Sequence, residues 1–355
     1  MSVLSVLSRT MITTANLFSN LTTAQGKKIA MRTREINGAH QQKIGRLNSG
    51  VAKWLAVKKS VGKAASVIHA TVGRAKAILG KIDAMILNVN KAGQPTSGTT
   101  NTAMYAASFD AAIKSIQSDV KNVRMQPNMI GNYEPRLTYK TSPSGTTGSV
   151  QGAFIGNDYY ITDSAGKRWV PDQNAKNLKR YDNYPSGATN KVGAFDGGLR
   201  LDSISGDAIA FTIAPNTASP ESFSGTLSRK GLRIMNSWYY NALATDADRQ
   251  KALSDLKSAR VAVNLEIQRY ELGASTATFY ENRVNAEIRG IKSKVADEII
   301  ARAKELKISQ DKLTWEFRNT QSIVAQSLAL KNEYAKMLAP IVNDKLTQAL
   351  LNVVA

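Results

Sequence analysis

Apolar side chains recur at helical spacing near both ends of the chain. Near the N-terminus they are separated by three, four or seven residues, the spacing of a coiled-coil seam with Thr14 as its polar member. Toward the C-terminus, two adjacent stripes make an apolar face too wide for a solvated helix. The residues are Leu4, Leu7, Met11, Phe18 and Leu21 at one end, and Ile323, Val324, Leu328, Leu330, Tyr334, Ala335, Met337, Leu338, Ile341 and Val342 at the other. Either the two ends pair inside one monomer, or they pair and also pack against neighbouring subunits.

The pattern changes period between these ends, over residues 127–237. Gly, Asn, Asp, Ser, Pro and aromatic residues become more frequent there, and short alternating runs replace the helical spacing. Ile209, Phe211 and Ile213 alternate with smaller residues, which places them on one face of a strand. Residues 159–171 and 226–234 each read as two short strands around a glycine-containing turn. This segment is predicted to be a β-rich insert.

A helical period returns at Thr245 and continues with no proline until Pro340. Thr245 is a suitable N-cap, and Asp246 and Asp248 fall in the first turn, where the helix dipole favours anions. In the N-terminal half, glycine, proline and serine gather at residues 93–98 and predict a break between helices. The expected fold class is therefore mainly α with a β-rich insert: long N- and C-terminal helices pair as a coiled-coil-like bundle, and a variable β domain lies in the centre.

Composition narrows the class of protein. A chain of 355 residues with 43% hydrophobic residues suits two or three domains better than one. The absence of cysteine excludes disulfides, thiolate metal sites and a cysteine nucleophile. The first 20 residues lack the basic run and continuous apolar segment of a secretory signal, and no run approaches 18 consecutive apolar residues. We therefore expect neither a cleaved signal peptide nor a membrane span.

The charge is strongly positive and unevenly distributed. The formal net charge is +20, and residues 24–91 hold 14 Lys or Arg against only Glu35 and Asp83, a local excess of 12. Such a field attracts polyanions and speeds encounter with them. A solvated helical face that keeps the protein soluble is the more ordinary interpretation.

No pattern in the sequence favours catalysis. His40 and His69 lie 29 residues apart with no acidic motif around either, so a packing or surface role is favoured for both. No phosphate-binding loop, zinc-protease motif or calcium loop occurs. We therefore predict a protein that is not an enzyme, with no catalytic, cofactor-binding or metal-ligating residues and no cofactor.

Two short motifs carry a resemblance to bacterial flagellin. In that family, a Leu-Gly-Ala or Phe-Gly-Ser step lies on the C-terminal helix and is followed by Asn-Arg, and an Arg-Leu-Ser-Ser-Gly step lies in the N-terminal half. The segment 236–275 is similar to the same region of a flagellin subclass. The matching residues here are Leu272, Gly273 and Ala274, then Asn282 and Arg283, and in the N-terminal half Arg46, Leu47, Asn48, Ser49 and Gly50. Physically, Gly273 would let a neighbouring helix approach, and the polar pair would fix register.

The chain also departs from the family pattern. Residues 51–66 are basic and contain a tryptophan, where flagellins usually carry an acidic run rich in small residues. The residues past Leu338 look like an extension beyond the usual end. The chain therefore resembles a divergent flagellin.

The resemblance implies a structural role and a division into five segments. The protein would be a subunit that polymerises into an extracellular helical filament, the flagellum of a motile bacterium. It would be exported without a cleaved signal through the flagellar machinery and would meet the export and capping proteins. The segments are an N-terminal filament-core helix at 1–40, an N-terminal helical shoulder at 41–126, a surface-exposed β-rich insert at 127–237, the long C-terminal helix of the shoulder at 238–310, and a C-terminal filament-core helix at 311–355.

One rival function stays open, a basic polyanion- or nucleic-acid-binding protein or a virion structural protein. Residues 24–91 would then contact the polyanion. Trp54 is the only aromatic residue of this region, so stacking on bases is poorly supported, whereas phosphate contact alone is possible.

Overall fold

The structure is a computed structural model that describes residues 3–94, 99–121, 127–132, 135–172 and 176–354. Within these ranges, the side chains of 3–15, 99–101 and 338–354 are not described. The chain forms two compact units. Unit 1 comprises Met1–Lys53 and Glu287–Ala355, and unit 2 comprises Trp54–Ala286.

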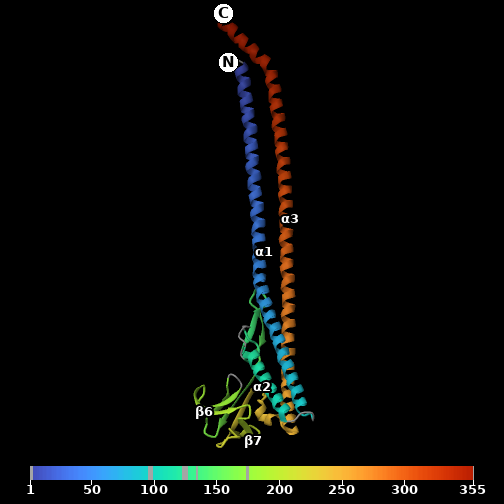
Figure 1. Cartoon of the computed structure of the whole chain (residues 1–355). Coiled ribbons are helices and arrows are strands. Elements are labelled where there is room, and N and C mark those ends of the chain that lie inside the picture. Colours follow the sequence, from blue (N-terminus) through green and yellow to red (C-terminus); the bar gives the residue numbers. More distant parts are fainter. Residues whose placement is uncertain (1–2, 95–98, 122–126, 133–134, 173–175, 355) are drawn as a thin grey trace. The chain divides into compact units, whose positions relative to one another are not determined.

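Two long helices contribute to both units (Figure 1). The helices are α1, Val3–Ala92; α2, Thr99–Lys121; the 3-10 helix η1, Ser237–Leu243; and α3, Asp246–Val354. The predicted break at 93–98 is confirmed, because α1 ends at Ala92 and α2 begins at Thr99. The predicted cap is confirmed as well: the Thr245 hydroxyl accepts from the Asp248 backbone N–H at 3.2 Å, and the Asp248 carboxylate accepts from the Thr245 N–H at 3.1 Å. This reciprocal pair satisfies two N–H groups at the helix start.

The β-rich segment forms two antiparallel sheets within unit 2. A two-stranded sheet contains β1, Arg136–Lys140, and β2, Thr147–Gln151. A seven-stranded sheet has the order β6-β5-β4-β3-β9-β8-β7. Its strands are β3, Asn157–Asp163; β4, Arg168–Pro171; β5, Asn177–Asn183; β6, Ser186–Ala194; β7, Leu199–Ser205; β8, Ala208–Ile213; and β9, Glu221–Gly231.

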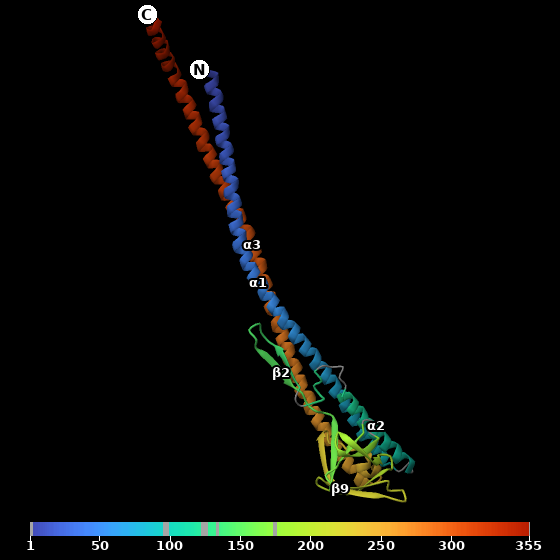
Figure 2. The same ribbon diagram turned by 90° about the vertical axis from the view of Figure 1, so that its left-hand side faces the viewer.

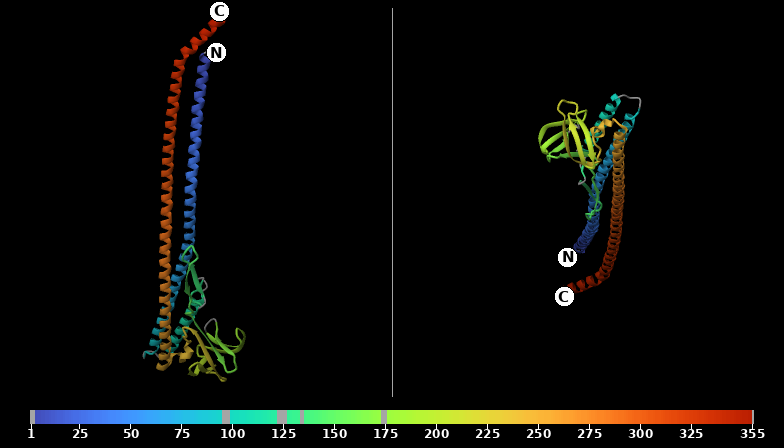
Figure 3. Two further views of the ribbon diagram at one scale, coloured as in Figure 1. Left: turned by 180° about the vertical axis from the view of Figure 1, so that it is seen from behind. Right: turned by 90° about the horizontal axis from the view of Figure 1, so that it is seen from below.

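The seven-stranded sheet curls into a half-barrel (Figure 3). The ammonium group of Lys191 on β6 reaches the carboxylate of Glu221 on β9, although three strands separate them in the sheet order. Inside the curl, the buried Trp169 ring meets the Phe211 ring edge-on at 5.2 Å and the Phe223 ring at 4.6 Å. Packed aromatic rings therefore form the core on this face of the sheet.

The strand predictions have mixed outcomes. Ile209, Phe211 and Ile213 are all buried on β8, as predicted. Residues 159–171 contain two strands around Gly166, whose φ is +73°, also as predicted. The interpretation of 226–234 as two strands is wrong, because β9 is one strand that runs to Gly231 and pairs with both β3 and β8.

The two-stranded sheet and the residues before it pack on α3 in unit 2 (Figure 2). The buried Tyr270 hydroxyl donates to the Met129 carbonyl at 2.6 Å, and burial raises the pKa of Tyr270 to about 12. Arg269 donates to the Gln151 carbonyl at 2.6 Å. A Cβ added at Gly273 would lie 3.0 Å from Val150 on β2. The close neighbour of Gly273 is therefore β2 of the same chain.

We expect Gly273→Val to lower the free energy of unfolding of unit 2 by about 1–3 kcal/mol, because the added methyl groups overpack the contact with Val150. Gly80→Val is the matched control: it also places valine inside a helix of unit 2, but a Cβ there meets nothing within 4 Å. Thermal and denaturant unfolding followed by circular dichroism measures both. Equal effects of the two variants would show that Val150 does not constrain position 273.

The expected fold class is confirmed: two long helices pair and a β-rich region lies between them in the sequence. In unit 2, Arg260 on α3 is 2.8 Å from Asp83 on α1, and Lys76 on α1 is 2.7 Å from Glu271 on α3. Ile68 of α1, which would lie 3.9 Å from a Cβ at Gly273 of α3, is fully buried. Among the described residues, no helix combines the length and hydrophobicity needed to cross a membrane.

Candidate assembly surface

The terminal halves of α1 and α3 lie side by side in unit 1 and run antiparallel (Figures 1 and 2). Lys28 is 3.0 Å from Glu316, and the Gln25 amide donates to the Leu313 carbonyl at 2.5 Å. Further along, Lys43 is 3.3 Å from Glu298. Residue numbers therefore rise on one helix as they fall on the other, which fixes the register of the pair.

The seam between these helices contains apolar and polar positions, which alternate from Leu21 to Ile44. On α1, the less exposed side chains recur every three or four residues. They are Leu21, Gln25, Ile29, Thr33, Ile36, His40, Ile44, Leu47 and Val51. Ile36 on α1 and Ile288 and Leu313 on α3 are buried. This spacing is typical of coiled-coil packing, in which polar seam positions specify register.

His40 is the most polar member of the seam. It is only 6% exposed, and its Nδ1 lies 2.6 Å from Glu298 Oε1 while its Nε2 lies 3.0 Å from Glu305 Oε2. Burial would raise the pKa of Glu298, but hydrogen bonds from His40 and Lys43 hold it below its ordinary value. The hydrogen bond from Lys28 likewise lowers the pKa of Glu316. Ionised carboxylates of α3 thus face cationic or donor groups of α1.

Large apolar side chains also lie on α3 outside this seam. We call the following set the exposed stripe: Ile308, Trp315, Ile323, Leu330, Tyr334 and Met337. Each is between 55% and 68% exposed. At 3.6 residues per turn they fall within about 100° of arc on one side of the helix. Large apolar side chains that gather in solvent on one side of a helix are typical of an interaction site.

A groove adjoins the exposed stripe within unit 1. It encloses about 580 Å³ between the two helices. Met31 of α1 and Ile308 and Leu313 of α3 contribute its apolar lining, and charged side chains such as Lys28 and Glu305 rim it. An apolar groove with a charged rim can accept an apolar side chain and orient it through the rim.

A scan against models of protein families finds no match to this chain, and a search of curated proteins finds none either. Three solved structures of flagellar proteins are similar to it. They are the flagellar junction protein FlgL from Legionella pneumophila (9% identity, TM-score 0.34, 75% of this chain and 99% of that one), flagellar hook-associated protein-3 from the same organism (10%, 0.34, 76% and 99%) and FlgL from Xanthomonas campestris (12%, 0.27, 76% and 99%).

The residues expected to pack between subunits occupy several environments. Phe18, Leu21 and Leu328 are half-buried in the single chain. Ile323, Leu330 and Tyr334 belong to the exposed stripe. The side chains of Leu4, Leu7, Met11, Leu338 and Val342 lie outside the described residues. Whether these residues meet a neighbouring subunit stays a prediction.

The motif residues are divided between the two units. In unit 1, Arg46 and Ser49 are exposed, Leu47 is half-buried, and a Cβ at Gly50 would lie 3.6 Å from Ile291 of α3. In unit 2, Leu272 is 70% exposed and Ala274 is buried, while Asn282 and Arg283 are exposed. Some of the motif residues therefore pack within the chain, and others are exposed to solvent.

Sequence reasoning missed the pairing of His40 with two glutamates and the contribution of Ile308 and Trp315 to the exposed stripe. The glutamates are 258 and 265 residues away from His40 in the chain, so no local motif could reveal them. The sequence offers one signal for the site: Glu298 and Glu305 are seven residues, or two turns, apart and therefore lie on the same face of α3.

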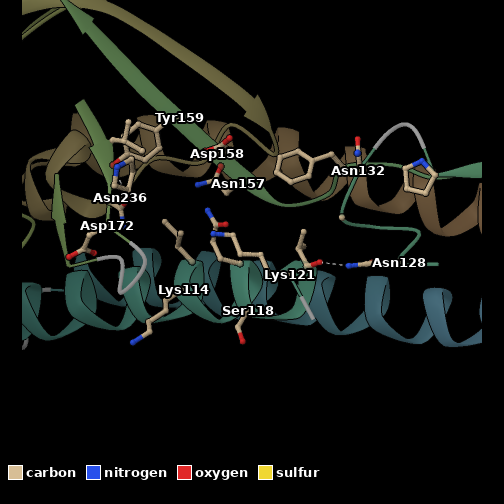
Figure 4. A pocket seen from close by; sticks show the side chains of 18 of the residues that line it. Lys114, Ser118, Lys121, Asn128, Asn132, Asn157, Asp158, Tyr159, Asp172 and Asn236 are labelled. Carbon is tan, nitrogen blue, oxygen red and sulfur yellow. Dashed lines mark hydrogen bonds between the residues drawn. The ribbon is translucent and has the colours of Figure 1, made fainter. Parts of the chain in front are cut away.

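A larger hollow, of about 810 Å³, lies within unit 2 beside α2 (Figure 4). Its amides take part in the fold: Asn157 donates to the Ile234 carbonyl, and Asn236 accepts from the Tyr159 hydroxyl at 3.0 Å and donates to Asp110 at 3.1 Å. Asp110 also accepts from Ser237, and its burial raises its pKa. Figure 4 shows Lys114 and Ser118 directed away from the strands. These bonds tie α2 to β3 and η1, which gives the amides a structural role.

Proposed function

We propose that this chain is a structural subunit that polymerises into an extracellular helical filament, the bacterial flagellum, and serves motility. Its partners would be further copies of itself and, during export and assembly, the flagellar export and capping machinery. The observation that carries the proposal is the exposed stripe on α3: unit 1 already pairs its two helices, yet six large apolar side chains beside the seam stay in solvent.

A polymer of identical subunits would cover this surface. Contacts between different patches of identical subunits generate open helical filaments when the rotation between subunits does not close into a ring. Burial of apolar area contributes about 25 cal/mol per Å². The flagellin-like motifs in the sequence support the same role, and the β-rich region would then face the medium.

Limited proteolysis of monomer and polymer tests the proposal. In the monomer, trypsin should remove the terminal segments of unit 1 first, because a long helix pair with an exposed apolar face opens more readily than the aromatic core of unit 2. The same digestion of polymer should leave both ends intact. Complete protection of both termini in a verified monomer would contradict the proposal, because the ends would then need no neighbouring subunit.

Free basic side chains favour a second candidate function, the binding of polyanions. Lys58, Lys59 and Lys63 on α1 are exposed, and no acidic side chain in the described part of the chain lies within ion-pair distance of them. We expect heparin to bind the monomer with an affinity that falls by orders of magnitude between about 50 and 200 mM salt. Replacing the three lysines with glutamine should weaken binding, and replacing Lys76, which pairs with Glu271, should matter less. Binding that is insensitive to salt would rule this function out.

A further inference from the structure

The contacts of His40 require a particular protonation state. Both ring nitrogens lie at hydrogen-bonding distance from a carboxylate, 2.6 Å to Glu298 and 3.0 Å to Glu305. An ionised carboxylate only accepts hydrogen bonds, whereas a neutral imidazole has one N–H and one lone pair. Only the imidazolium ring can donate to both glutamates at once. Loss of its proton would turn one of the two contacts into a repulsion between a lone pair and a carboxylate.

Cationic side chains of both helices lie beside the two glutamates. From α1, Lys43 lies 3.3 Å from the Glu298 oxygen that His40 contacts, and Arg32 lies 3.9 Å from Glu305 while pairing with Glu35 at 2.7 Å. From α3, Arg302 is one turn from each glutamate. These cations stabilise the ionised glutamates, but none of them can take the place of the second N–H of the ring.

We propose that His40, Glu298 and Glu305 form a proton-dependent clamp between α1 and α3 of unit 1, closed in mildly acidic solution and weakened when the imidazolium ring loses its proton. The clamp would regulate how firmly the two helices pair. It needs no ligand and no second subunit. A consequence for filament assembly would rest on the proposed function, whereas the clamp itself is a property of the monomer.

The direction of the pH dependence follows from proton linkage. Both contacts need an N–H donor on each ring nitrogen, and an ordinary histidine side chain loses the second N–H above about pH 6.5. Pairing therefore weakens as the pH rises through and above that value, by at most about tenfold in the opening constant for each pH unit. At the acidic end, Glu298 has a lowered pKa in the pair, so its contribution is present above its unfolded value and is lost as the pH falls through the folded value. The clamp is thus closed between these two limits.

Hydrogen exchange of the full-length monomer tests the clamp. Amide protection is measured between pH 5.5 and 8.5 in peptides from residues 25–47 and 291–316, and rates are corrected for the pH dependence of chemical exchange. In the wild type, the opening constant should rise by about three- to tenfold per unit above pH 6.5. His40→Gln should remove this slope. His69→Gln is the control, because His69 is exposed on α1 in unit 2, and it should keep the wild-type slope.

Glu305→Gln separates the clamp from a packing role of His40. With an amide at position 305, a neutral ring can donate to Glu298 and accept from the amide, so both contacts survive deprotonation. This variant should stay protected at pH 8.5 and lose the slope, even if His40→Gln weakens the pair for other reasons. A wild-type opening constant independent of pH would overturn the proposal. So would a Glu305→Gln variant with the wild-type slope.

Discussion

Trp315→Asp combined with Ile323→Asp should yield a folded monomer that no longer polymerises. Both side chains are more than half exposed in the single chain, so their replacement removes little packing from unit 1. In a polymer that covers the exposed stripe, the two carboxylates would be buried without partners, at a cost of several kcal/mol each. Sedimentation of concentrated protein should show polymer for the wild type and none for the variant.

The control for this experiment adds the same amount of negative charge to the same helix. Thr314→Asp with Ala325→Asp adds two carboxylates to exposed positions of α3 that lie on another side of the helix from the exposed stripe. This variant should polymerise almost as the wild type does. Equal loss of polymer in both double variants would attribute the effect to charge rather than to burial of the exposed stripe. Unimpaired polymerisation of Trp315→Asp with Ile323→Asp would show that the exposed stripe is not covered.

Removal of residues 127–237 should collapse the helical part of unit 2. This deletion takes away Met129, which accepts the hydrogen bond of Tyr270, and Val150, which packs on Gly273. The buried Tyr270 would lose its partner and much of its packing, and each large apolar side chain lost from a core costs about 2–5 kcal/mol. Circular dichroism should show a loss of helix and of cooperative thermal unfolding.

A shorter deletion is the matched comparison. Asn157 on β3 and Gly231 on β9 are paired neighbours, so a Gly-Ser bridge can replace residues 158–230 across about 4.8 Å. The variant keeps the β1–β2 hairpin, and we expect it to stay helical. It should be less stable than the wild type, because Trp238 loses its contact with the Phe211 ring at 6.1 Å. Equal stability of the two deletions would show that the hairpin contributes nothing to the helices.

The sequence was informative wherever a local rule decides the structure. The period of the apolar residues predicts the terminal helices, the alternation at Ile209 predicts β8, and Thr245 followed by Asp248 predicts the start of α3. These features depend on residues within a few positions of one another. The β-rich character of the insert follows from the same kind of signal.

Features that depend on register could not be predicted. A heptad pattern indicates which face of a helix is buried but not which residues meet across it, so the partners of His40 stayed hidden. Gly273 signalled a close approach, and only the structure identifies Val150 of β2 as the neighbour. Gly231 suggested a turn inside a hairpin, but pairing with β3 and β8 on both sides extends β9 up to that residue.

Negative-stain electron microscopy of the concentrated, purified protein is the most direct test of the central claim. A structural subunit whose exposed stripe packs against neighbouring copies should form long filaments of uniform diameter, and Trp315→Asp with Ile323→Asp should abolish them. Compact particles that never elongate at any concentration, with the exposed stripe still accessible to solvent, would contradict the account.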